Sequence, residues 1–255
     1  MIRRCLVFCA ACCAASLPVL AEEMSSAEAV ATILNSKTSV SAKIFAEAQE
    51  VVAREAADGK PLQQFVIGVT TDDKDLAKRY LDASRGRILE LAEKKNNPLA
   101  WYLLSMESNN VQQLRRAADG GNVQALNALG AIFTNWAFER KLSSNELERA
   151  LSYSHDCFRR AAFKSDPNGF INLGTCYMRG FGCRQDLAEA FRCFRTAAEA
   201  GHPEGMENVS NCYRYGKGVT KNETLSLYWL MRARAARGDE AAENWLKERE
   251  SRGQK

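Results

Sequence analysis

Residues 167–201, PNGFINLGTCYMRGFGCRQDLAEAFRCFRTAAEAG, contain the pattern that decides the fold. The segment opens with proline, which suits the first position of a helix because its missing N–H would be unpaired there. Apolar residues then recur three or four positions apart, as on one face of a helix. Gly180 and Gly182 mark the end of that helix, since glycine adopts the left-handed cap conformation at little cost. A second amphipathic helix follows, so the segment predicts a helix-turn-helix unit.

The same unit returns 36 positions later in the chain. The residues that recur are Leu173, Gly174, Tyr177, Gly180 and Gly182, which return as Val209, Ser210, Tyr213, Gly216 and Gly218. Helix starts are predicted near residues 61, 98, 123, 167, 203 and 240, four of them at proline. A unit of this kind cannot bury its apolar face alone, so neighbouring units stack. The sequence therefore predicts an all-α fold, an α-solenoid of helix-turn-helix repeats over residues 61–250, followed by a disordered tail at 251–255.

Part of this pattern resembles the Sel-1-like repeat, a relative of the tetratricopeptide repeat. The resemblance rests on Leu173-Gly174, Tyr177, Gly180-x-Gly182, Asp186 and the segment from Ala190 to Gly201. It covers 167–201 and 203–238 well, 121–164 in part, where the Gly-x-Gly turn is replaced, and 61–120 weakly. The resemblance implies a right-handed superhelix of paired helices that acts as a protein-binding scaffold, often in signalling, secretion or envelope processes. It does not indicate which partner is bound.

The composition is that of a folded, soluble, helical chain. Of its 255 residues, 46% are hydrophobic and 26% are charged, enough for one extended domain with a continuous core. The net charge of +4 falls to +2 if Arg3 and Arg4 are removed with a leader, and a charge this small argues against a nucleic-acid partner. Several arginines gather near the C-terminus, where a solvated helix face is the favoured interpretation: Arg232, Arg234, Arg237, Arg249 and Arg252.

The first 21 residues have the features of a signal peptide. Arg3 and Arg4 form a short basic start, residues 5–17 are apolar, and Val19-Leu20-Ala21 places small residues where signal peptidase cleaves. We therefore expect cleavage before Glu22 and a periplasmic or secreted protein. A lipid anchor at Cys12 is a minor alternative, because Cys9 occupies the place that needs an aliphatic residue. No other segment of the sequence reaches membrane-spanning length, so no integral membrane segment is expected after cleavage.

Residues 22–60 precede the repeats. Within them, residues 41–57 place Ile44, Phe45, Val51 and further apolar residues on one helical stripe that stops at Asp58-Gly59. The favoured interpretation is an N-terminal helical cap, which a solenoid needs to shield its end. The alternative is a helix that docks on another protein.

Removal of the leader reduces nine cysteines to five: Cys157, Cys176, Cys183, Cys193 and Cys212. An odd number in an exported protein indicates disulfide bridges and one remaining thiol. Because the members of each pair are equally distant from the turn between their helices, we predict the bridges Cys157–Cys176 and Cys193–Cys212, with Cys183 reduced. Equidistance also allows Cys176–Cys193, and Cys176–Cys183 across the glycine turn is a further alternative. Buried thiols that only fill the core are the remaining alternative.

Motifs of common catalytic sites are missing from the sequence. There is no phosphate-binding Gly-x-x-x-x-Gly-Lys-Ser/Thr loop, no His-Glu-x-x-His, no Ser-x-x-Lys, and no Cys-x-x-Cys after the leader. The two histidines, His155 and His202, are interpreted as ordinary surface residues rather than metal ligands or bases. The sequence therefore indicates no cofactor and no metal site, and favours a non-enzymatic protein. The alternative is an envelope hydrolase, β-lactamase-like or directed at peptidoglycan, with a dispersed active site.

A polar row on the first helix of the two best-matched repeats is the candidate binding surface. Polar residues lie three or four positions apart, opposite the apolar stripe: Asn168, Asn172, Thr175 and Arg179, then Glu204, Asn208, Asn211 and Tyr215 one repeat later. Resemblance to tetratricopeptide repeats implies that this helix lines a concave surface. Asparagine both donates and accepts hydrogen bonds, which suits an extended peptide or a chain terminus, so we predict a peptide or protein partner. A solvated face without a ligand is the alternative.

The corresponding positions in the earlier repeats are apolar instead. They are Leu62, Val66, Val69, Leu99, Leu103 and Met106. We expect this stretch to be covered by the helix at 41–57, which leaves the C-terminal half of the chain as the open site.

Overall fold

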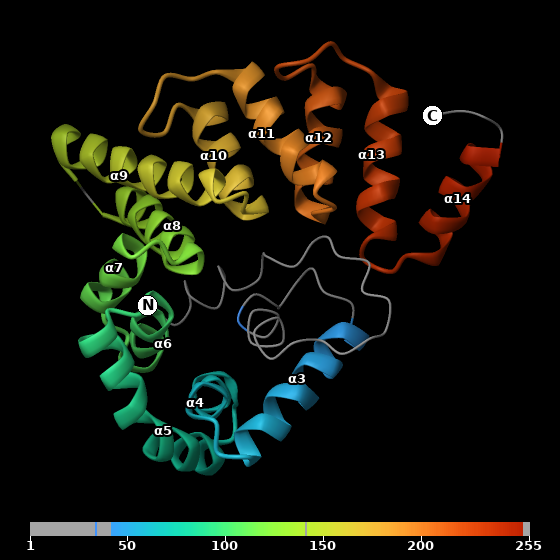
Figure 1. Ribbon diagram of the computed structural model, residues 1–255. Coiled ribbons are helices and arrows are strands. Elements are labelled where there is room, and N and C mark those ends of the chain that lie inside the picture. The colour runs from blue at the N-terminus through green and yellow to red at the C-terminus, as the bar shows by residue number, and fades with distance from the viewer. Residues whose placement is uncertain (1–33, 35–41, 141, 252–255) are drawn as a thin grey trace. The chain divides into compact units, whose positions relative to one another are not determined.

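The structure, a computed structural model, describes Leu34, residues 42–140 and residues 142–251. Within this part of the chain every regular element is an α-helix and no strand occurs, which confirms the predicted all-α fold (Figure 1). The described residues form two compact units, the first ending at Ile132 and the second beginning at Phe133. The predicted signal peptide, residues 1–21, lies outside the described residues.

The first unit contains helices α3 to α7 and the beginning of α8. Their bounds are α3 (Ala42–Ala57), α4 (Pro61–Thr70), α5 (Lys74–Lys95), α6 (Pro98–Ser108), α7 (Val111–Asp119) and α8 (Val123–Glu139). Helix α4 packs against both α3 and α5, and α6 packs against α5 and α7. Helix α3 lies within residues 22–60, the predicted N-terminal cap. Among the apolar positions expected to be covered, Val66 and Leu103 are fully buried and the other four are half-buried.

The second unit contains the end of α8 and helices α9 to α14. The bounds are α9 (Ser144–Phe163), α10 (Pro167–Arg179), α11 (Leu187–Glu199), α12 (Pro203–Tyr215), α13 (Glu223–Ala235) and α14 (Glu240–Ser251). From α9 onward each helix packs against the next, so α10–α11 and α12–α13 stack as successive helix-turn-helix repeats. This arrangement confirms the predicted α-solenoid. Helix α14 includes Ser251, the first residue of the predicted tail, and residues 252–255 lie outside the described residues.

Short-range contacts account for where the helices begin and end. Six helices begin at the positions that the sequence marks as repeat starts: Pro61, Pro98, Val123, Pro167, Pro203 and Glu240. Before two of the prolines a side chain caps the first turn, because Asn97 accepts a hydrogen bond from the backbone of Ala100 at 3.0 Å and Asp166 from that of Gly169 at 2.7 Å. Helices α10 and α12 both end at a glycine with a left-handed backbone. Each of these effects depends on only a few neighbouring residues.

Glycine also allows consecutive repeats to approach closely. Gly205 on α12 faces α11, and a Cβ at this position would lie 2.8 Å from both the Cβ of Ala197 and the backbone nitrogen of Ala198. One repeat earlier, Gly169 on α10 faces Ala162 of α9 in the same way. The two contacts are 36 positions apart, so the packing between repeats recurs at the interval of the sequence pattern.

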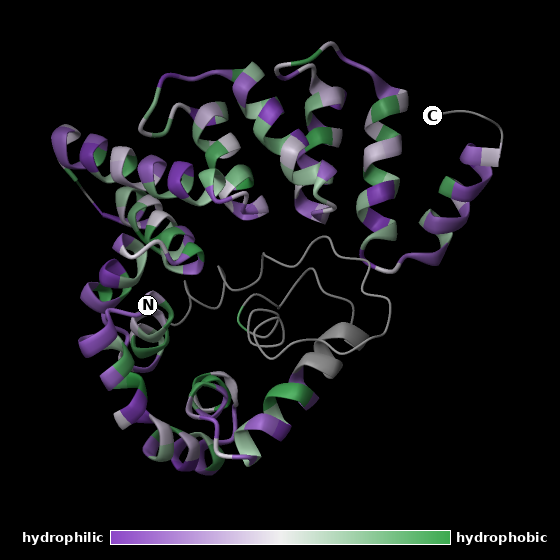
Figure 2. Cartoon of the chain, viewed as in Figure 1, coloured by the Kyte–Doolittle hydropathy of each residue, from purple (hydrophilic) through white to green (hydrophobic). Residues whose placement is uncertain are grey.

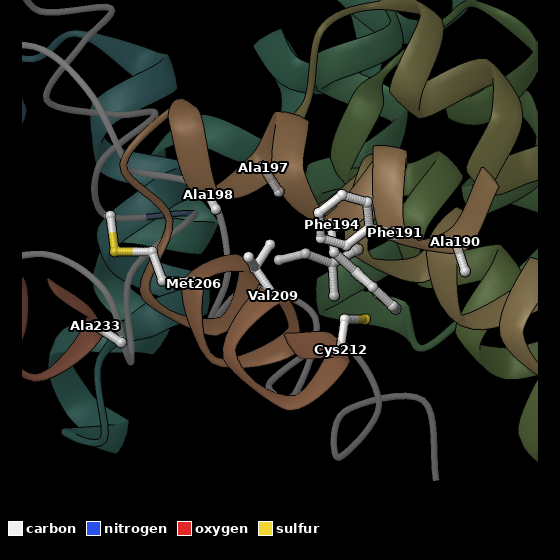
Figure 3. Close-up of a cluster of buried hydrophobic side chains, with 10 residues drawn as sticks. Ala190, Phe191, Phe194, Ala197, Ala198, Met206, Val209, Cys212 and Ala233 are labelled. Atoms are coloured by element: carbon white, nitrogen blue, oxygen red, sulfur yellow. The ribbon is translucent and has the colours of Figure 1, made fainter. Parts of the chain in front are cut away.

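Aromatic and aliphatic side chains fill the core between these stacked helices. Figure 3 shows Phe191 and Phe194 of α11 together with Val209 of α12, all buried. Gly174 of α10 leaves room for Phe194, since a Cβ at position 174 would lie 2.7 Å from its ring. Along the helices of this unit hydrophobic and hydrophilic residues alternate (Figure 2), as expected when each helix buries one face.

Candidate protein-binding surface

The structure places the eight polar candidates on α10 and α12, but not all of them at the surface. Asn168 is only 4% exposed, so its assignment to an open binding face is wrong. It lies in the first turn of α10, which is enclosed because α10 packs between α9 and α11. The other seven residues are half-buried or exposed and are called the α10–α12 face below: Asn172, Thr175, Arg179, Glu204, Asn208, Asn211 and Tyr215.

The members of the α10–α12 face differ in what they offer a ligand. The hydroxyl of Thr175 donates to the backbone carbonyl of Ile171 at 3.0 Å, so its proton is used inside the helix. Arg179 and Asn211 are exposed, whereas Asn208 is half-buried. Tyr215, at the end of α12, is 62% exposed although its side chain is large and aromatic.

A groove adjoins this face where α12 ends and α13 begins. It encloses about 430 Å³ and is lined by Arg214, Tyr215, Lys221, Glu223, Ser226 and Leu227, together called the α12–α13 groove. Leu227 is 42% exposed, so the groove presents two large apolar side chains to solvent. The sequence pattern identifies Tyr215 but not the α13 residues, because their place in the groove depends on how α13 packs against α12. The helical spacing of Glu223 and Leu227 is the only local signal for them.

Positive charge prevails around the groove. Lys221 pairs with Glu223 at 3.0 Å. The ammonium group of Lys217 lies 5.7 Å from the centre of the Tyr215 ring. Neither Lys217 nor Arg214 forms an ion pair with a carboxylate of the described residues. The groove therefore combines apolar contact area with cations that a partner could neutralise.

Several of the late arginines contact other side chains of the protein. Arg237 donates two hydrogen bonds to the carboxylate of Glu207 on α12, the one to Oε2 at 2.9 Å, and these bonds raise the pKa of Arg237. Arg232 lies over the ring of Trp229 at 4.7 Å, and Arg249 lies over that of Trp245 at 5.4 Å. These three residues therefore contact α12 and the α13–α14 pair, while Arg237 remains exposed, and the solvated-face interpretation stays a prediction.

The five cysteines that follow the predicted leader are thiols in this structure. Cys176 and Cys193 belong to one apolar cluster, Cys183 packs against it, and Cys212 belongs to the adjacent cluster. The structure therefore brings together Cys176, Cys183 and Cys193, the residues of the alternative pairings. The bridges Cys157–Cys176 and Cys193–Cys212 are not formed in this structure and stay predictions for the oxidised protein.

Burial makes these thiols weak acids. It raises the pKa of Cys176 to about 12, with further contributions from Cys183 and Cys193. The pKa of Cys193 rises to about 11 through burial and the nearby carboxylate of Glu189, and burial raises that of Cys212 to about 11 against the opposing charge of Lys217. A thiol reacts as its thiolate, so these groups are poor nucleophiles at neutral pH. Their arrangement suits core packing.

The two histidines are not both surface residues. His202 is 2% exposed, so its interpretation as a surface residue is wrong. It precedes Pro203 in the turn between α11 and α12, which is enclosed by the stacked repeats, and its backbone N–H donates to Ala197 at 3.0 Å. His155 is half-buried, its ring edge lies against Tyr177 at 5.7 Å, and burial lowers its pKa. In the described part of the chain, no cluster of three or more His, Cys, Asp or Glu side chains could hold a metal ion.

Comparison with known proteins finds a family model that matches four of these helices. The model of the Sel1 repeat matches residues 171–202 and 203–236, which contain α10 to α13 apart from the first residues of α10. Both segments are thus similar to the Sel1 repeat. The α10–α12 face therefore lies on the first helices of the two segments that match the Sel1 repeat, and the α12–α13 groove lies within the second matched segment.

Solved structures of Sel1-repeat proteins are similar to this chain. A Sel1 repeat protein from Oxalobacter formigenes is 21% identical, over 83% of this chain and 62% of that one, with a TM-score of 0.49. A protective antigen present in uropathogenic Escherichia coli strains, which displays an SLR fold, is 15% identical over 86% of this chain and 57% of that one, with a TM-score of 0.35. The chain spans about three fifths of the length of these proteins. No curated protein sequence matches it.

None of the helices in the described ranges is both long enough and apolar enough to span a bilayer.

Proposed function

We propose that this chain is a non-enzymatic scaffold that binds a peptide or protein partner through the α10–α12 face and the α12–α13 groove. The observation that carries the proposal is the exposure of Tyr215, 62%, beside a groove that Leu227 also lines. Large apolar side chains left open next to a hollow are typical of interaction surfaces rather than of a core. Sel1 repeats typically serve as protein-interaction scaffolds, which supports the same function.

Polar groups beside the groove suit an extended chain segment. Asn211 lies on α12 one turn before Tyr215, and Asn208 lies about one turn before Asn211. Each side-chain amide has both donors and an acceptor. A peptide backbone has the complementary groups at regular intervals. Aromatic contact area and amide hydrogen bonds would thus act together on one ligand.

The test of this function is capture of a partner from a cell-envelope extract by the purified protein. The variant Asn208→Ala/Asn211→Ala/Leu227→Ala removes the amides and one wall of the groove without touching a fully buried residue. We expect it to lose the captured partner while its Tm is unchanged. The matched control is Arg159→Ala/Arg192→Ala/Arg195→Ala, three exposed residues on α9 and α11. Equal capture by the groove variant and the control would overturn the proposal.

The same preparations also test the alternative of an envelope hydrolase. They are assayed for hydrolysis of a chromogenic β-lactam and of purified peptidoglycan. We expect no turnover above the rate without protein. Turnover that rises with protein concentration would favour the hydrolase and overturn the non-enzymatic assignment.

We further propose that the protein acts outside the cytoplasm, in the periplasm or as a secreted protein. The basic start, apolar run and Val19-Leu20-Ala21 at the N-terminus support this location. N-terminal sequencing of the protein from cells that express the full chain should give Glu22 first. An intact Met1 would contradict export through this leader.

A further inference from the structure

Three successive repeats each have a cation beside an aromatic ring at the end of their first helix, and all three pairs lie in the second unit. At the end of α8, the guanidinium of Arg140 lies 5.2 Å from the centre of the Trp136 ring. At the end of α10, Arg179 lies 5.9 Å from the ring of Phe181. At the end of α12, Lys217 lies 5.7 Å from the ring of Tyr215. These three pairs, with Phe138, are called the cation–aromatic row.

The second and third pairs occupy equivalent positions in their repeats. Arg179 and Tyr215 are each the last residue of their helix, and Phe181 and Lys217 each follow the capping glycine. In the earlier repeat the cation ends the helix and the ring follows the glycine, whereas in the later repeat the ring ends the helix and the cation follows the glycine. Both repeats therefore have a cation–aromatic pair at the same two positions. Figure 1 shows the α10–α11 and α12–α13 turns, which carry these pairs, at the same edge of the second unit.

The first pair joins the second through a ring contact. Phe138 of α8 lies against Phe181, with ring centres 5.0 Å apart. Phe138 is 59% exposed and Trp136 is 40% exposed, although both are large apolar side chains. The row therefore presents open aromatic side chains at the end of α8, Trp136 and Phe138, and at the end of α12, Tyr215.

The cations of the row differ from several other cations of the same unit. Arg159, Arg192 and Arg195 on α9 and α11 form ion pairs within their own helices, and Arg234 and Arg237 pair with Asp239 and Glu207. Among the described residues no carboxylate pairs with Arg140, Arg179 or Lys217. Positive charge along the row is therefore left without a neutralising group from the protein.

We propose that the cation–aromatic row binds an acidic segment of a protein partner, one that carries both carboxylates and apolar side chains. The inference rests on the scaffold function proposed above and names the chemistry of its partner. A ring face fixes the position of a cation and leaves its N–H donors free for a carboxylate. Exposed Trp, Tyr, Phe and Arg are also the residue types that dominate binding energy at protein interfaces. Acidic side chains of the ligand pair with the three cations, and its apolar side chains cover Trp136, Phe138 and Tyr215.

The experiment selects ligands from a random-peptide library displayed on phage, with the full protein as bait. We expect the selected peptides to be enriched in Asp and Glu together with aromatic or aliphatic residues. The best peptide is then synthesised in two versions, one with its acidic residues intact and one in which every Asp is replaced by Asn and every Glu by Gln. The Kd of each version for the protein is measured by fluorescence anisotropy. The amide version should bind about tenfold more weakly or worse, and added salt should weaken binding of the acidic version.

Variants locate the binding to the row. Arg140→Gln/Arg179→Gln/Lys217→Gln should weaken the acidic peptide by about tenfold or more, because three pairing charges are lost. The matched control Arg159→Gln/Arg192→Gln/Arg195→Gln removes the same number of charges from the same unit and should change Kd by less than about twofold. An equal loss in both variants would show that only net charge matters and would overturn the proposal.

Other outcomes also decide the question. Selection of neutral or basic peptides, or of no peptide, would overturn the proposal that the row binds an acidic ligand. Binding to vesicles of anionic lipid but to no acidic peptide would assign the row to a membrane surface instead. A partner captured by Arg140→Gln/Arg179→Gln/Lys217→Gln but not by Asn208→Ala/Asn211→Ala/Leu227→Ala would refute binding at the row. This result would leave the proposed scaffold function intact.

Discussion

Gly218 lies directly against the backbone carbonyl of Leu187, the first residue of α11 in the preceding repeat. A Cβ at position 218 would overlap that carbonyl oxygen. Gly182 makes the same contact with the carbonyl of Leu151 on α9. The second glycine of each Gly-x-Gly turn is therefore a stacking residue that fits one repeat onto the one before it. The first glycine, Gly180 or Gly216, caps its own helix.

This difference predicts unequal effects of two glycine substitutions in the same turn. Gly216→Ala places a side chain on a left-handed backbone, at φ +66°, where its Cβ would meet nothing closer than 3.6 Å. It should lower the free energy of unfolding by about 1–2 kcal/mol. Gly218→Ala has a similar φ of +72° but adds the overlap with Leu187, so it should cost a further 1–3 kcal/mol or so. Urea unfolding measures both, and equal losses would show that Gly218 acts only as a turn residue.

Gly174 and Phe194 should be energetically coupled. A Cβ at position 174 would lie 2.7 Å from the Phe194 ring, so Gly174→Ser should destabilise the protein by about 1–3 kcal/mol. The next repeat has Ser210 and Leu230 at these positions, and the Ser210 hydroxyl donates to the Ser226 carbonyl at 2.7 Å. Gly174→Ser/Phe194→Leu should therefore cost less than the sum of the single changes, by about 1 kcal/mol in a double-mutant cycle. Strict additivity would contradict the coupling.

Cysteine alkylation should depend on folding. The pKa of Cys176 is raised to about 12 and those of Cys193 and Cys212 to about 11, so little thiolate is present near pH 8 in the folded state. Cys183 is half-buried, so iodoacetamide should label it first in the reduced protein. Peptide mapping by mass spectrometry measures the order. Labelling of all five cysteines at one rate would contradict the prediction that burial protects the thiols from alkylation.

The same alkylation applied to protein isolated without reductant tests the predicted bridges. If Cys157–Cys176 and Cys193–Cys212 form after export, only Cys183 should be labelled even in denaturant. Labelling of all five cysteines in denaturant would show that they remain packed thiols.

The stability of the reduced protein should fall in alkaline solution for the same reason. The folded-state pKa values of Cys176, Cys193 and Cys212 lie above the ordinary thiol value of 9.0. Above about pH 9 the unfolded chain loses thiol protons that the folded chain keeps, so the free energy of unfolding decreases as pH rises from 9 toward 11–12. Urea unfolding at a series of pH values measures the slope. The variant Cys176→Ala should be less stable at neutral pH but show a shallower alkaline slope, and an unchanged slope would assign the effect to other groups.

Local patterns in the sequence determine the helices of this protein. Proline at the first position, a capping side chain before it and glycine after the last turn act over a few residues, so the starts at Pro61, Pro98, Pro167 and Pro203 are visible without a structure. The recurrence at 36 positions likewise predicts that the units stack, since each has an apolar face that it cannot bury alone. Part of the candidate site follows from the same periodicity, which identifies Tyr215 and Arg179 as outward-facing residues on equivalent helices.

Only the tertiary structure decides which side chains the stacking encloses and which it leaves open. Asn168 and His202 are polar residues at the starts of helices, where the sequence suggests a surface, yet the packing of neighbouring repeats buries both. The α12–α13 groove and the contact of Phe138 with Phe181 join residues that no local pattern relates. The physical reason is that burial and charge pairing depend on elements distant in the chain, whereas helix formation depends on neighbours within one or two turns.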